Sequence, residues 1–167
     1  MRRQISPREL DYLFHRIGTA IWHLQNVENS LVPLIIIKGI AVDLNSIEES
    51  EALRLEAKFN KLTLGKLIGK LTELDLVEPE FIERLRAFND ERKWVVHNSV
   101  FESGDHLYTE SGRSQFFSRI ERFVNEAENL HKYIGELVVE YSVTKGMSRE
   151  EIEARALEEI GRLRGET

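Results

Sequence analysis

Apolar residues recur at steps of three and four along much of the chain, which is the spacing of one face of an α-helix. Two series are long enough to predict long amphipathic helices: Leu10, Leu13, Ile17, Ala20, Leu24, Val27 and Leu31, and later Phe116, Ile120, Phe123, Ala127, Leu130, Ile134, Leu137 and Tyr141. Seams of this kind are typical of helices that pack lengthwise in a bundle.

The first long helix has a clear start signal. Ser6 can cap it, Pro7 suits the first helical position, and Glu9 stands where a capping box needs an acid. We expect Pro33 to end or kink this helix. The segment 34–42 is then apolar on every side, so that its periodicity does not distinguish helix from strand. We expect a short buried helix, because no other segment offers a strand to pair with it.

Two shorter helices are expected next. Ser46 is predicted to cap the first, which reaches Phe59 with a weak apolar stripe and is interpreted as peripheral. Thr63 is predicted to cap the second, which carries Gly65 and Gly69 on one face. Glycine destabilises a helix interior by about 1 kcal/mol relative to alanine. The pair therefore predicts the close approach of another backbone, with a contact inside the chain favoured over one between subunits.

The helix that follows is predicted to start at Pro79 and to run to about Asn98. After it, residues 101–113 are polar and contain glycine, which predicts a loop of about a dozen residues, a length often associated with function. The second long helix is expected from Ser114 until Gly146 closes it.

The last helix is predicted to be capped by Ser148 and to end near Gly165. We interpret it as an appendage that is mobile or swapped onto a partner. The fold class is therefore all-α, an up-and-down bundle of four to five main helices with an appended C-terminal helix. We expect residues 1–145 to form the bundle and 146–167 the appendage.

Composition narrows the possible functions. The chain of 167 residues has 23 basic and 29 acidic residues and a formal net charge of -6, which argues against unselective binding of polyanions over the whole surface. It has no cysteine, which excludes disulfides, thiolate metal sites and a cysteine nucleophile. The absence fits a reducing cytoplasm.

No targeting or membrane segment is expected. Basic residues at the N-terminus are not followed by an apolar run, so that they do not form a secretory signal. The longest apolar run, residues 31–44, is interrupted by Pro33, Lys38, Gly39 and Asp43 and is shorter than the roughly 20 residues needed to span a bilayer. We expect a cytoplasmic protein without membrane contact.

One apolar stripe is broken by a residue equipped for chemistry. Phe81, Leu85, Phe88, Arg92 and Val95 share one helix face, and the fourth of them is an arginine. A guanidinium at such a position is costly to desolvate unless it is paired or opens onto a wet cleft. The site hypothesis therefore starts from Arg92.

Plainer interpretations stand beside it. Arg92 can be a core-edge residue whose head pairs with Asp90, Glu91 or an acid of another helix. His97, which follows five residues later, is either a group that exchanges protons near neutral pH or an ordinary helix-end histidine near the last carbonyls. Trp94 can stack on a base, but packing is the favoured interpretation.

A metal site is not expected. Glu128 and His131 form a Glu-x-x-His pair of the kind that supplies ligands in di-metal bundles. The chain has no second such pair, and it has no glycine-rich phosphate loop. We expect neither a metal nor another cofactor.

Arg92, four residues and His97, near the end of a helix, resemble the signature of the HEPN superfamily of helical-bundle proteins. The context is also similar to that family: a long first helix, the Thr63–Ile68 segment, a polar step at Asn89–Glu91 and a long amphipathic helix afterwards. Lys93 differs, because the family typically has a small polar residue, aspartate or histidine there.

The resemblance implies a metal-independent endoribonuclease that acts as a homodimer, in which two arginine-histidine pairs meet at one cleft. It implies a toxin-antitoxin or defence context, with RNA as substrate and an antitoxin or other protein as partner. The catalytic residues would be Arg92 and His97, and we expect Lys93, Asn89 and Asn98 to contact the substrate. The alternative is a noncatalytic HEPN-like interaction module.

Overall fold

The protein is described by a computed structural model for residues 2–41 and 46–165, and these ranges are helical for most of their length. The elements are α1 (Pro7–Gly39), α2 (Glu49–Phe59), α3 (Leu64–Glu73), α4 (Pro79–Lys93), the π-helical segment η1 (Trp94–Asn98), α5 (Ser99–Ser103), the 3-10 helix η2 (Asp105–Tyr108), α6 (Glu110–Thr144) and α7 (Arg149–Leu163). The all-α prediction is confirmed.

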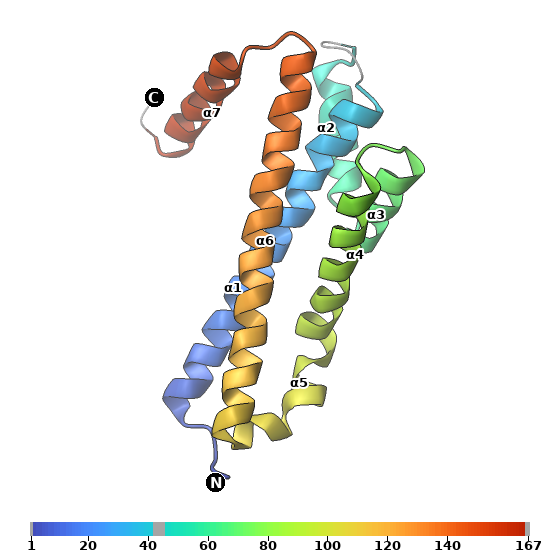
Figure 1. Ribbon diagram of the computed structural model, residues 1–167. Coiled ribbons are helices and arrows are strands. Elements are labelled where there is room, and N and C mark those ends of the chain that lie inside the picture. The colour runs from blue at the N-terminus through green and yellow to red at the C-terminus, as the bar shows by residue number, and fades with distance from the viewer. Residues whose placement is uncertain (1, 42–45, 166–167) are drawn as a thin grey trace.

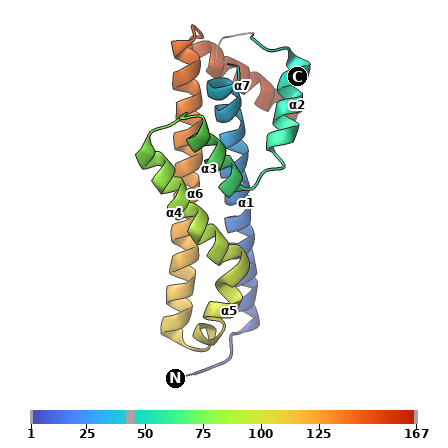
Figure 2. The same cartoon turned by 90° about the vertical axis from the view of Figure 1, so that its right-hand side faces the viewer.

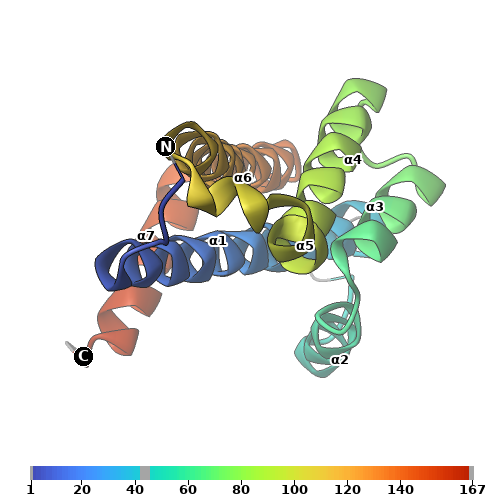
Figure 3. The ribbon, with the colours of Figure 1, turned by 90° about the horizontal axis from the view of Figure 1, so that it is seen from below.

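The architecture is an up-and-down bundle. Figure 1 shows α1 and α6 side by side along the molecule, with α4 returning beside them toward α5. In Figure 2, α3 crosses the front of the bundle and α2 stands at its side. The view from below in Figure 3 places α4 and α5 next to the α1–α6 pair, with α7 at the far end. The division of the chain at residue 145 stays a prediction.

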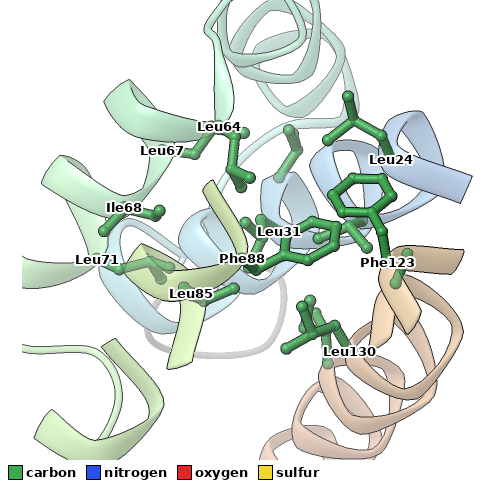
Figure 4. Packing of buried hydrophobic residues seen from close by; sticks show 14 of the residues in the cluster. Leu24, Leu31, Leu64, Leu67, Ile68, Leu71, Leu85, Phe88, Phe123 and Leu130 are labelled. Carbon is green, nitrogen blue, oxygen red and sulfur yellow. The ribbon is translucent and has the colours of Figure 1, made fainter. Parts of the chain in front are cut away.

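The core lies between α1, α3, α4 and α6, where apolar side chains point toward one another (Figure 4). At its centre the rings of Phe88 and Phe123 are stacked, with centroids 4.6 Å apart and an interplanar angle of 9°. Both long stripes predicted from the sequence are buried over most of their length. Fully buried members include Val27, Leu31, Leu34, Ile35, Leu64, Leu67, Leu71, Leu85, Ile120, Leu130 and Ile134.

The prediction that Pro33 ends or kinks the first helix is wrong, because α1 continues through it to Gly39. Proline inside a helix lacks the N–H donor and costs about 3 kcal/mol. Here Pro33 is exposed, whereas Val32, Leu34 and Ile35 beside it are buried. Burial of each such side chain stabilises by about 1.5–3 kcal/mol and outweighs the local cost. The segment 34–42 is thus the end of α1 up to Gly39, and residues 42–45 lie outside the described ranges.

The predicted loop at 101–113 is also wrong, since α5, η2 and the first turn of α6 occupy it. The Thr109 hydroxyl caps α6 by accepting a hydrogen bond of 3.1 Å from the backbone N–H of Gly112. A Cβ at Gly112 would lie 2.2 Å from the carbonyl oxygen of His106. The tight turn therefore requires glycine, and α6 starts at Glu110 rather than at Ser114. Buried Arg113 secures the turn by donating 2.8 Å to the carbonyl of Leu107.

The helix starts predicted at Ser6, Thr63, Pro79 and Ser148 are confirmed, and the start predicted at Ser46 is corrected. Ser6 caps α1 and Ser148 caps α7, each in a capping box. Ser46 does not cap α2, whose N-cap is Glu48, and Thr63 is the N-cap of α3 but makes no side-chain cap bond. That bond comes from another helix, because Glu28 Oε1 of α1 accepts the backbone N–H of Leu64 at 2.9 Å.

The described helices do not include one that is both long enough and apolar enough to cross a membrane.

Candidate functional site

Arg92 takes its predicted place in the apolar stripe of α4. Phe81, Leu85, Phe88 and Val95 are buried, and the side chain of Arg92 keeps 19% of its surface exposed. Packing of the four apolar neighbours therefore holds the arginine stem, while the guanidinium lies at the edge of the core.

The guanidinium has unused hydrogen-bond donors. Arg92 Nε lies 3.9 Å from Glu28 Oε1, and that oxygen already accepts the N–H of Leu64. Nε is buried without a hydrogen-bond partner, and the Arg92 side chain makes no hydrogen bond to any residue of the described ranges. Of the alternatives foreseen for its pairing, the acid of another helix is the one observed. The distance from Arg92 Nε to Glu28 is too long for a hydrogen bond, so the N–H donors of the guanidinium remain available to an anion.

The acids nearest in sequence are engaged elsewhere. Asp90 Oδ1 pairs with Lys93 Nζ at 2.8 Å on the exposed side of α4. Glu91 accepts two bonds from Arg119 of α6, at 2.8 and 2.9 Å. Neither carboxylate competes for Arg92.

A π-helical turn lies between Arg92 and His97. In an α-helix, residues five apart are rotated by about 140° around the axis. A π turn closes its hydrogen bond over one more residue, so each residue in it rotates the chain by less than in an α-helix. Because η1 covers Trp94–Asn98, the rotation about the helix axis between Arg92 and His97 is smaller than in a regular α-helix, and no hydrogen bond joins the two side chains. Single π turns are frequent at functional sites.

The surroundings of His97 are open and apolar. Its side chain is exposed and makes no hydrogen bond or ion pair with a described residue. Val96, Val100 and Phe101 next to it are also exposed, and Phe101 reaches 92%. Water-exposed apolar groups gathered in this way commonly mark an interface.

The predicted substrate-contacting residues are dispersed. Lys93 and Asn98 are exposed, and Lys93 is paired with Asp90. Asn89 faces α3 instead: a Cβ on Gly65 would lie 3.5 Å from its Nδ2, and its Oδ1 is buried without a partner. The structure therefore groups Asn89 with the glycine face of α3.

That glycine face has no close backbone neighbour. Around Gly69 nothing in the described ranges lies within 4 Å of where a Cβ would be, and at Gly65 only the Asn89 amide does. The predicted close approach of another backbone of the same chain at these two glycines is wrong. Its residues line an open pocket between α3 and α4, and a contact between subunits stays a prediction.

Where α4 passes into η1, Glu91 and Trp94 form a cluster with Arg119 of α6 that sequence reasoning missed. Arg119 lies over the Trp94 ring, 3.7 Å from its centroid, while it binds Glu91. The hydrogen bonds from Arg119 hold the pKa of the Glu91 carboxyl below its usual range, and the carboxylate raises the pKa of Arg119. Trp94 is buried and its ring packs against Phe116, which agrees with the favoured packing interpretation.

Next to this cluster lies a pocket of about 390 Å³ lined by Trp94, Arg119, Arg122 and His106 among others. Arg122 and His106 are exposed, and their side chains have no hydrogen-bond or ion-pair partner in the described ranges. No short-range pattern links these positions, because they come from η1, η2 and α6. Only the periodicity of α6, which places 119 and 122 three residues apart, was available as a signal.

The Glu128-x-x-His131 pair does not form part of a metal cluster. Glu128 Oε1 lies 3.4 Å from Nε2 of His23 across the α1–α6 contact. Within residues 2–41 and 46–165, no group of three or more His, Asp or Glu side chains is placed to hold a metal ion.

Comparison with known proteins adds no relative: no family model, no curated protein and no solved structure matches the chain.

Proposed function

We propose that the protein is a HEPN-like, metal-independent endoribonuclease that acts as a homodimer in the cytoplasm, with Arg92 and His97 as its catalytic residues. The observation that carries the proposal is the state of Arg92. Its guanidinium is held by a packed stem, has unused donors, and is joined by a π turn to an exposed histidine.

The chemistry requires a proton carrier and an anion binder. The imidazole of His97 takes the proton of a ribose 2′-hydroxyl as the 2′-oxygen attacks phosphorus, or it gives a proton to the leaving 5′-oxygen. The planar guanidinium of Arg92 binds the non-bridging phosphate oxygens and stabilises the charge that develops on them. The products are a 2′,3′-cyclic phosphate and a free 5′-hydroxyl, and no step uses a metal ion.

The dimer is supported by the apolar side chains around His97. Val96, Val100 and Phe101 are exposed in the single chain, and a second copy that covers them would bury them from water. Each active site would then lie close to its symmetry mate. We further propose a toxin-antitoxin or defence role, in which a protein partner restrains cleavage.

A second function is supported by the contact between Arg92 and Glu28. A carboxylate 3.9 Å from Nε lowers the attraction of the arginine for a phosphate. In a noncatalytic HEPN-like interaction module, this ion pair would join α1 to α4, and Lys93 in place of the small polar residue would have no catalytic consequence.

Product analysis separates the two functions. Purified protein is incubated with single-stranded RNA in EDTA, and fragment ends are identified by mass spectrometry. The nuclease proposal predicts 2′,3′-cyclic phosphate ends with RNA and no cleavage of the matching DNA, which lacks the 2′-hydroxyl nucleophile. Intact RNA over a range of protein concentrations would favour the interaction module.

A further inference from the structure

Helix α7 has an apolar side that the described part of the chain leaves largely exposed. Ile152, Ile160 and Leu163 share one face, and Leu163 is 72% exposed. No residue of α7 is buried. Helices of about 15 residues are marginally stable in water unless an amphipathic face is packed. A partner surface is therefore expected.

The connection to α6 directs α7 away from its own bundle. Gly146 turns the chain with a φ of 99°, the Ser148 capping box fixes the start of α7, and Arg149 pairs with Glu136 of α6. In Figures 1 and 3, α7 projects from the end of α6 and lies apart from α2.

A groove between α1 and α2 has the complementary character. It has a volume of about 340 Å³, and Val32, Ile36 and Ile37 of α1 line it together with Ala52 and Leu53 of α2. Leu53 is 58% exposed. Two helices that leave such an apolar groove between them accept a third amphipathic helix.

Charges match along the two surfaces. Glu49 and Glu56 line the groove seven residues apart, about 10 Å along α2, and neither has a side-chain partner in the described ranges. Arg155 and Arg162 flank the apolar face of α7 at the same seven-residue spacing. Arg155 likewise has no partner in those ranges, and Arg162 makes only an exposed pair with Glu159 of its own helix.

We propose that α7 of one copy of this chain occupies the α1–α2 groove of a second copy, in a reciprocal exchange that closes a two-fold dimer. Apolar residues of α7 cover Leu53, and Arg155 and Arg162 pair with Glu49 and Glu56. The inference does not depend on ribonuclease activity. It is compatible with the contact proposed around His97. A two-fold axis parallel to the bundle brings the α7 end of one copy beside the α7 end of the other, and the His97 end beside the other His97 end.

Cysteine crosslinking gives a direct test, since the natural chain has no cysteine. Leu53→Cys and Ile160→Cys are made in separate full-length chains and mixed before mild oxidation. We expect a disulfide-linked dimer of one chain of each kind, and little crosslinking in either variant alone. A disulfide that forms only within a chain carrying both substitutions would overturn the proposal, and so would a monomeric wild-type protein in sedimentation.

Charge reversal tests the register. The Arg155→Glu, Arg162→Glu double variant is expected to raise the dimer dissociation constant at least about tenfold, and added Glu49→Arg and Glu56→Arg are expected to restore it. Ala154→Glu, on the opposite face of α7, is the matched control and leaves association unchanged. Circular dichroism verifies folding of each variant. A dimer that is indifferent to these reversals but is lost with Phe101→Glu would overturn the exchange while leaving the contact around His97 in place.

Discussion

Nε of Arg92 lies 3.9 Å from Oε1 of Glu28, an oxygen that also accepts the backbone N–H of Leu64. One carboxylate thus caps α3 and faces the candidate catalytic arginine. Its two roles are separable by substitution, because an amide oxygen retains the capping bond without the negative charge.

Glu28→Ala is expected to lower the free energy of unfolding by about 1 kcal/mol, because the cap of α3 is lost. Glu28→Gln keeps the acceptor for the N–H of Leu64 and is expected to lower the free energy of unfolding by less. It removes the negative charge beside Arg92 and is therefore expected to tighten RNA binding. Urea denaturation and RNA titration of both variants check these outcomes. Equal destabilisation by alanine and glutamine would contradict the capping role.

Gly112 and Gly135 lie in the same helix and give a matched pair. Alanine at Gly112 would place its Cβ 2.2 Å from the His106 carbonyl oxygen, and we expect a loss of about 2 kcal/mol or more in the free energy of unfolding. Alanine at Gly135 meets nothing within 4 Å and is expected to stabilise by up to about 1 kcal/mol. Thermal or urea unfolding measures both. If the two variants were equally stable, the tight turn at η2 would be misplaced.

Pro33→Ala is expected to stabilise the protein. Alanine restores the missing backbone donor inside α1, which stabilises the folded chain by about 3 kcal/mol. It also makes the unfolded chain more flexible, which lowers stability by about 1 kcal/mol. The net expectation is about 2 kcal/mol in chemical denaturation. A loss of stability would mean that α1 is broken at Pro33.

The ion pair between Glu91 and Arg119 predicts a pH dependence of stability. Hydrogen bonds from Arg119 depress the pKa of Glu91 below the ordinary 4.5, so that its contribution is present above that pH and is lost as the pH falls through and below it. Glu91→Gln is therefore expected to be less stable than wild type near neutral pH, with the difference shrinking in acid. The side chain is partly exposed, so a small difference is expected. A difference that grows on acidification would contradict the pairing.

Local periodicity was sufficient to predict the longer helices and most of the core, but not the short helices α5 and η2. The stripe from Phe116 to Ile134 is buried and that from Leu10 to Leu31 is mostly buried, because a three-four spacing fixes which face of a helix meets the bundle. The errors arose where tertiary contacts override local signals. Burial of the residues around Pro33 keeps α1 helical through the proline. Before α6, the close contact of Gly112 with the His106 carbonyl allows a tight turn where a loop was predicted.

The site was only half accessible to sequence reasoning. The break of the apolar stripe at Arg92 identified its position at the core edge, since the stripe itself is local. Glu28 is 64 residues away on another helix, and the stacking of Arg119 on Trp94 joins separate elements. Pairings of that kind depend on the packing of whole helices. The π turn that rotates His97 also has no pattern in the residues it contains.

The most direct test of the central claim is the rate of RNA cleavage in EDTA by wild type and by Arg92→Ala and His97→Ala, with Lys93→Ala as a neighbouring control. Removing a proton carrier or a transition-state donor typically lowers rates by at least about 100-fold. We predict losses of that size for Arg92→Ala and His97→Ala in folded protein, and a smaller loss for Lys93→Ala. Equal rates in wild type and both site variants would contradict the assignment of Arg92 and His97.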